Sequence, residues 1–96
     1  LISVDCGISN YAEAERAKEL GLDFIVVDHH EVPERRPPAF AVIDHRREDN
    51  ESAIKSLSGA GMGFYFALAT RARLRDAGFF ANGRKEPDLR ELLDLV

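Results

Sequence analysis

The sequence predicts an α/β fold of three layers, with a mostly parallel sheet and helices on both faces. The first observation is the run 23–28, Asp-Phe-Ile-Val-Val-Asp, whose continuous apolar and β-branched centre is typical of a strand buried on both sides. The second is the amphipathic segment 10–20, which separates that run from an earlier strand-like segment at 1–5. Strands joined through a helix pair in parallel, so these three segments predict a strand-helix-strand unit.

The helix of this unit has recognisable start and stop signals. Asn10 followed by Glu13 has the capping-box spacing, so we expect the helix to begin there. Gly21 suits the left-handed turn that often ends a helix. The apolar face between these signals is formed by residues at helical spacing: Tyr11, Ala14, Ala17 and Leu20.

The rest of the chain alternates loops with shorter elements. Residues 29–39 contain three prolines and predict an extended loop, 40–43 predict a third strand, and 44–55 form a charged loop. The glycine-rich segment 59–63 leads into an apolar helix that we expect to be largely buried. A last helix should open after Asp88, a plausible N-cap, with Glu91 at the capping-box position.

Composition excludes several classes of protein. The 96 residues carry a formal net charge of -4, with 45% hydrophobic and 31% charged residues, as expected for one soluble globular unit. The lone Cys6 permits neither an internal disulfide nor a cysteine zinc knuckle, and it favours the cytoplasm. No apolar run is long enough to span a bilayer, so we expect no membrane association. The acidic charge argues against nucleic-acid binding by bulk charge alone, but leaves a local basic groove open.

Polar side chains stand where the first two strands end. Asp5 follows the first strand, and Asp28, His29 and His30 close the second. A right-handed crossover places both strand ends on one rim of the sheet, where α/β proteins bind ligands. Carboxylates and imidazoles favour a divalent cation of the manganese type. Singly, each residue is typical of a turn or a solvated loop, but an Asp-His-His run directly after a buried strand favours a metal site.

These residues resemble a known family, the DHH phosphoesterases, and within it the RecJ-type single-stranded-DNA-specific exonucleases. The resemblance covers essentially the whole chain and is made specific by the step of 23 residues from Asp5 to Asp28. Asp44-His45 stands where relatives often carry Asn-Pro. The matching segments are Val-Asp-Cys-Gly-Ile at 4–8, Asp-His-His-Glu at 28–31, the strand segment 37–43 and the glycine-rich helix entry 58–64.

The resemblance implies a role for each residue of the predicted site. Asp5 would bridge two Mn²⁺ or Mg²⁺ ions, His29 would ligate one of them, His30 would face the scissile phosphate, and Asp28 would support a histidine or the loop. The implied reaction is two-metal phosphodiester hydrolysis. Because the chain opens in a strand and stops within a helix pattern, we expect residues 1–96 to be a partial DHH domain, truncated at both ends and inactive alone. Its remaining ligands, an Asp-x-Asp and a further aspartate, would lie outside it.

The resemblance implies single-stranded nucleic acid as the substrate, and favours DNA degraded from 5' to 3' in repair or recombination. Two alternatives stay open. One is another DHH phosphoesterase that cleaves nano-RNA, cyclic dinucleotides or pyrophosphate. The other is a non-catalytic α/β module that holds a metal or a partner through Asp5 and Asp28.

Two further features carry a functional and a structural interpretation side by side. The backbone amides of 59–63 could face a phosphate, or the glycines could let the helix approach the sheet closely. Six arginines could contact a nucleic-acid backbone or simply be solvated, and the sequence singles out none of them. They are Arg35, Arg36, Arg46, Arg47, Arg71 and Arg75.

Overall fold

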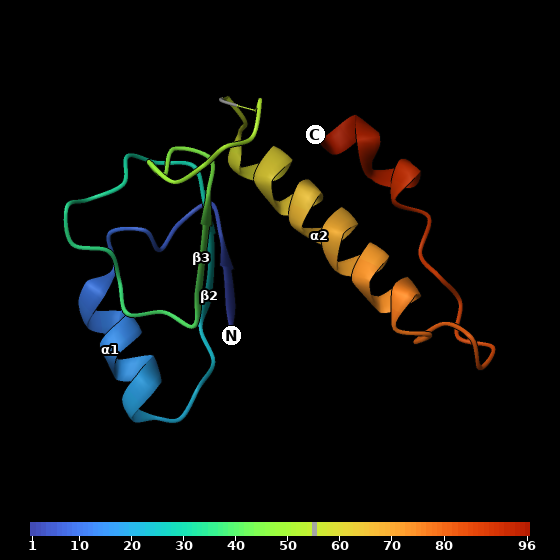
Figure 1. The fold of residues 1–96 in the computed structure, drawn as a ribbon, viewed down its shortest axis with the longest axis horizontal. Coiled ribbons are helices and arrows are strands. Elements are labelled where there is room, and N and C mark those ends of the chain that lie inside the picture. Colours follow the sequence, from blue (N-terminus) through green and yellow to red (C-terminus); the bar gives the residue numbers. More distant parts are fainter. Residues whose placement is uncertain (55) are drawn as a thin grey trace.

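A computed structural model describes residues 1–54 and 56–96, so Lys55, the end of the predicted charged loop, lies outside the described residues. Three strands, β1 (Ile2–Val4), β2 (Ile25–Asp28) and β3 (Ala41–Asp44), form one parallel sheet in the order β1-β2-β3. Helices lie on both faces of this sheet (Figure 1). The predicted three-layer α/β fold is therefore confirmed.

The central strand has the burial that its apolar run predicts. Val26 and Val27 are fully buried, since β2 has a strand on each side and a helix over each face. The strands are shorter than the sequence predicts. For example, β2 begins at Ile25 instead of position 23. The third strand is shifted by one residue, and Phe40, which precedes it, is exposed.

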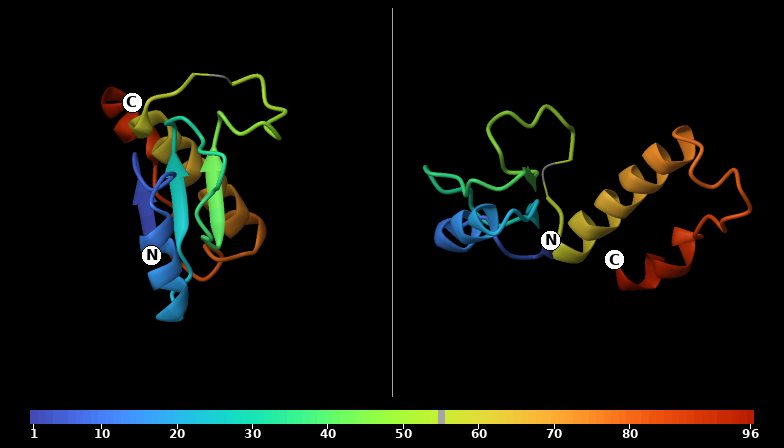
Figure 2. Two further views of the ribbon diagram at one scale, coloured as in Figure 1. Left: turned by 90° about the vertical axis from the view of Figure 1, so that its left-hand side faces the viewer. Right: turned by 90° about the horizontal axis from the view of Figure 1, so that it is seen from below.

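Helix α1 (Tyr11–Glu19) covers one face of the sheet (Figure 2). Its small buried residues let it lie close to the strands, in a core made of Ala14, Ala17, Phe24 and Val26, with Ala39 and Val42 at the margin. Gly21 adopts a φ of +70°, as its predicted place after the helix requires. The predicted capping box is wrong. Asn10 has ψ near 65° rather than an extended value, and its side chain makes no capping hydrogen bond.

Helix α2 (Gly59–Asp76) lies against the opposite face, where it contacts β1 and β2. The glycines form its first turn instead of preceding it, and Ser58 is the N-cap, its Oγ accepting from the Gly61 N–H. The expectation of a largely buried helix is wrong for the described chain. Only Gly59, Gly61 and Met62 are buried, because the far half of α2 extends beyond the three strands (Figure 1).

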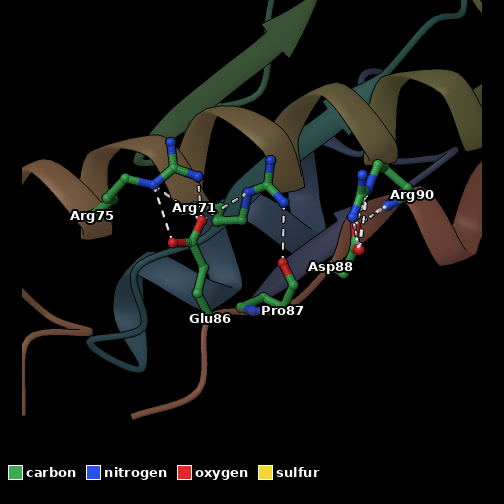
Figure 3. Close-up of polar contacts among 6 residues, drawn as sticks. All are labelled: Arg71, Arg75, Glu86, Pro87, Asp88 and Arg90. Atoms are coloured by element: carbon green, nitrogen blue, oxygen red, sulfur yellow. Dashed lines mark hydrogen bonds and ion pairs between the residues drawn. The ribbon is translucent and has the colours of Figure 1, made fainter. Parts of the chain in front are cut away.

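The C-terminal segment returns alongside α2. Residues Leu89–Leu95 form a 3-10 helix, η1, instead of the α-helix we expect from the sequence, and Asp88 caps it by accepting from the Arg90 N–H at 3.0 Å. Arg71 and Arg75 both pair with Glu86, and Arg71 also donates to the Pro87 carbonyl at 3.0 Å (Figure 3). These two arginines thus fasten the segment before η1 to α2.

No helix within residues 1–54 and 56–96 combines the length and the apolar character needed to cross a bilayer.

Candidate metal centre

The carboxyl ends of β1 and β2 place the predicted site residues side by side. Asp5 is the first residue after β1, and its N–H donates to the Val27 carbonyl at 3.0 Å. Asp28 is the last residue of β2, so His29 and His30 begin the loop that leaves the same rim. The sequence-based expectation that the two strand ends converge is confirmed.

Three of the four predicted side chains form a cluster. Asp5, His29 and His30 each offer one ligand atom, and these atoms all lie within 4.8 Å of one another. His29 Nε2 and Asp5 Oδ1 are 3.0 Å apart. Two atoms that bind one ion at right angles, each about 2.1 Å from it, are also about 3.0 Å apart. The spacing of the Asp5 and His29 atoms therefore fits a shared divalent ion, and a carboxylate with imidazoles is a donor set that a Mn²⁺-like ion accepts.

Asp28 is not in this cluster, because its carboxyl group faces the protein interior. It is only 1% exposed, and it accepts from the backbone N–H groups of Ile8 at 2.9 Å, His29 at 2.8 Å and His30 at 3.4 Å. Burial by itself would raise the pKa of this carboxyl, but these hydrogen bonds and one from the His30 ring hold the pKa below its usual range. Asp28 therefore orders the loop that carries both histidines.

The contact with Asp28 also fixes the tautomer of His30. An ionised carboxylate only accepts hydrogen bonds, so His30 Nδ1, 2.7 Å from Asp28 Oδ1, must carry the proton. In a neutral imidazole the lone pair then lies on Nε2. The His30 side chain is 58% exposed, so this nitrogen remains accessible to a metal ion or a phosphate.

Several known proteins are similar to this chain in sequence or in structure. The model for the DHH family, N-terminal domain, matches residues 1–96. The chain belongs to the DHH family. It is 43% identical to the single-stranded-DNA-specific exonuclease RecJ of Dickeya dadantii and 44% identical to that of Escherichia coli K12, in each case over all of this chain and 17% of the relative. A crystal structure of exonuclease RecJ bound to manganese matches with a TM-score of 0.65 and 34% identity, over 76% of this chain and 18% of that one.

In this DHH-family chain, the rim contains a further pair of polar residues that the sequence analysis missed. Asp44 ends β3 opposite Asp28 in the register, and it is only 5% exposed. Its Oδ1 accepts from the Arg46 N–H at 2.8 Å. Among the described residues, neither Asp44 Oδ2 nor the neighbouring His45 Nδ1, both buried, has a hydrogen-bond partner. The available signal was the one used for Asp5 and Asp28, an aspartate directly after an apolar strand.

Burial raises the pKa of the Asp44 carboxyl and the nearby Asp28 charge raises it further, although the Arg46 N–H and His45 oppose this. A folded-state pKa above the unfolded one means that ionisation costs stability, so this cost grows as the pH rises past the usual carboxyl range. We expect Asp44→Asn to stabilise the protein at pH 7 by about 1 kcal/mol, since the amide is neutral and can also donate.

Urea unfolding at several pH values tests this. The advantage of Asp44→Asn should shrink as the pH falls through the raised pKa of Asp44, because the carboxyl is then protonated and neutral in the folded state. A variant that is less stable than the wild type at pH 7 would show that the buried charge has a favourable partner in solution.

The arginines that follow the site are mostly engaged within the chain. Arg46 pairs with Glu31, and Arg47 pairs with Asp49. Arg35 stacks on the Tyr11 ring, 3.7 Å from its centroid. The loops that carry these residues line a cleft of about 530 Å³ with mixed charge, whose lining residues are Glu31, Val32, Pro33, Glu34, Arg36, Arg46, Arg47, Glu48 and Asp49. Contact of Arg46 or Arg47 with nucleic acid would therefore require exchange of an existing ion pair.

Proposed function

We propose that this chain is part of the catalytic domain of a metal-dependent RecJ-type exonuclease, which degrades single-stranded DNA from 5' to 3' in repair or recombination. The observation that carries the proposal is the cluster of Asp5, His29 and His30 at the carboxyl ends of two parallel strands. The proposal is also supported by the sequence identity between this chain and RecJ exonucleases, which extends over the whole chain.

In this proposal, Asp5 and His29 hold the metal. A carboxylate has two oxygens, so Asp5 can serve two ions, and His29 Nε2 provides a neutral nitrogen ligand to one of them. Further ligands would come from outside residues 1–96. Bound Mn²⁺ or Mg²⁺ would supply an activated water and neutralise charge on the phosphate. Manganese is the ion held by the matching RecJ crystal structure.

The other two residues orient the reacting groups. His30 presents Nε2 toward the scissile phosphate, since its Nδ1 proton is held by Asp28. Asp28 acts through His30 and through the backbone of the loop, where its carboxylate accepts from His29 and His30. The position of both imidazoles thus depends on one buried carboxylate.

The proposal also places the protein in the cytoplasm, where a DNA exonuclease meets its substrate. The free, exposed thiol of Cys6 is compatible with that reducing compartment.

The test is digestion of defined substrates by the full-length protein with Mn²⁺. We expect a 5'-labelled single-stranded DNA to release labelled mononucleotides early, while a 3'-labelled strand is shortened stepwise from its other end. Early release of the 3' label would reverse the proposed polarity. Preference for short RNA, cyclic dinucleotides or pyrophosphate would place the protein in another branch of the DHH family, and absence of hydrolysis of all four would favour a binding module.

A further inference from the structure

The backbone of Asp5 has an unusual conformation for a residue with a side chain. Its φ is +66°, in the left-handed region, and it is the only non-glycine residue with a positive φ in the part of the chain that the structure describes. Residues with a Cβ generally avoid this region because the Cβ crowds the following carbonyl; aspartate tolerates it better than most, and contacts with neighbouring structure help to hold Asp5 there. On one side, the hydrogen bond from the Asp5 N–H to the Val27 carbonyl does so.

On the other side, the first turn of α2 lies directly against the Asp5 side chain. A Cβ placed on Gly59 would overlap Oδ1 and Cγ of Asp5 and would lie 2.6 Å from its Cβ. Rotation about the Cα–Cβ bond of Asp5 moves the carboxyl group but leaves Cβ in place. A side chain at position 59 must therefore displace either the backbone of Asp5 or the start of the helix.

The same helix face meets β1 again one turn later, at a point away from the carboxylate. A Cβ on Gly63 would lie 3.0 Å from Cγ1 of Val4, the residue before Asp5. Gly59 and Gly63 thus share the close helix-strand contact, but only Gly59 touches the Asp5 carboxyl group. A substitution at Gly63 should therefore disturb helix packing alone, whereas one at Gly59 should also move the Asp5 carboxylate.

The Asp5 carboxylate is consequently held between two elements. His29 Nε2 lies 3.0 Å from its Oδ1, and the N-terminal end of the 18-residue helix α2 lies beside it. The positive end of a helix dipole favours a negative charge at that place. Both contacts are made at Oδ1 of Asp5.

We propose that Gly59 is a positioning residue for the metal centre. The bare backbone at the start of α2 sets where the Asp5 carboxylate lies, and through it the affinity for the divalent ion. The inference rests on the proposed function, because it assigns to Gly59 an effect on the site formed by Asp5, His29 and His30.

Mn²⁺ titration of the full-length protein, followed by the electron paramagnetic resonance of free Mn²⁺, tests the proposal. We expect Gly59→Ala to weaken Mn²⁺ binding by about 10- to 100-fold, the usual range for residues that orient metal ligands. The matched control is Gly63→Ala, which should lower the Tm through the contact with Val4 and keep wild-type affinity. Wild-type affinity in Gly59→Ala, or equal losses in both variants, would overturn the proposal.

A double-mutant cycle in Tm covers the case in which Gly59→Ala folds poorly. Asp5→Gly removes the colliding Cβ and carboxyl group and also relieves the positive φ. We expect Gly59→Ala to lower the Tm when Asp5 is present, and to leave it unchanged or raise it in the Asp5→Gly background, since alanine is the better helix former. An equal fall in both backgrounds would overturn the proposed contact.

The outcomes also separate this inference from the proposed function. If the wild type binds no Mn²⁺, the metal centre fails, while the Tm cycle still decides whether Gly59 positions Asp5. If the wild type binds Mn²⁺ and Gly59→Ala binds it equally well, only the role of Gly59 fails.

Discussion

Asp5→Asn should lower Mn²⁺-dependent hydrolysis of single-stranded DNA by the full-length protein roughly 10³-fold. The asparagine keeps the shape of the side chain but removes its negative charge and one ligand oxygen. Metal ions supply several kcal/mol of transition-state stabilisation, and every 1.4 kcal/mol or so is a factor of ten in rate. The fold should remain intact, because the Asp5 side chain is 62% exposed and its role in the sheet is made by the backbone.

Initial rates at saturating Mn²⁺, with circular dichroism as the check on folding, measure this effect. The matched control is Asp23→Asn, an exposed aspartate just before β2, at the end of that strand opposite to the cluster. It should retain wild-type activity. A folded Asp5→Asn variant that digests DNA at the wild-type rate would remove Asp5 from the metal centre.

Asp28→Ala should lower the free energy of unfolding by about 3 kcal/mol at pH 7. The substitution leaves three backbone N–H groups without their acceptor, that of Ile8 at a buried position and those of His29 and His30 at part-buried ones, and each such loss costs about 1 kcal/mol. The pKa of Asp28 is lowered in the folded protein, so its contribution is present above the unfolded value of 3.8 and is lost as the pH falls through the folded value.

Urea unfolding at pH 7 and in increasingly acidic buffer checks both parts of this prediction. The difference between the wild type and Asp28→Ala should narrow in acid. Asp28→Asn is the graded control, because it keeps the volume and one acceptor oxygen and should lose less than the alanine variant. Equal stability of wild type and Asp28→Ala at pH 7 would show that water or local rearrangement replaces the buried acceptor.

The sequence alone predicts those features of the fold and the site that follow from local hydrophobic patterns. The apolar run of β2 predicts burial on both faces, and the carboxylates that end β1 and β2 follow from the same pattern. The convergence of Asp5 with His29 needed only the general rule for parallel strands joined by a helix. The burial of β2 and the position of these carboxylates depend on the hydrophobic pattern within short segments and on the general topology of a strand-helix-strand unit, and both can be inferred from the sequence.

Features that depend on distant contacts could not be predicted in this way. The contact of Gly59 with Asp5 joins residues 54 positions apart, so the glycine run alone left both packing and phosphate binding open, with packing slightly favoured. The capping box at Asn10 failed because the backbone entering α1 fixes ψ at 65°, a value that a residue pattern does not encode. The burial of Asp44, which is only 5% exposed, is likewise not encoded by its immediate sequence neighbours.

A Mn²⁺ titration followed by electron paramagnetic resonance tests directly whether Asp5 and His29 hold a divalent ion at the carboxyl ends of β1 and β2. The titration compares the full-length protein with its Asp5→Asn, His29→Ala and Asp23→Asn variants. We expect tight binding by the wild type and by Asp23→Asn, and loss of at least one tightly bound ion in each of the other two. Wild-type stoichiometry and affinity in folded Asp5→Asn and His29→Ala proteins would contradict this assignment.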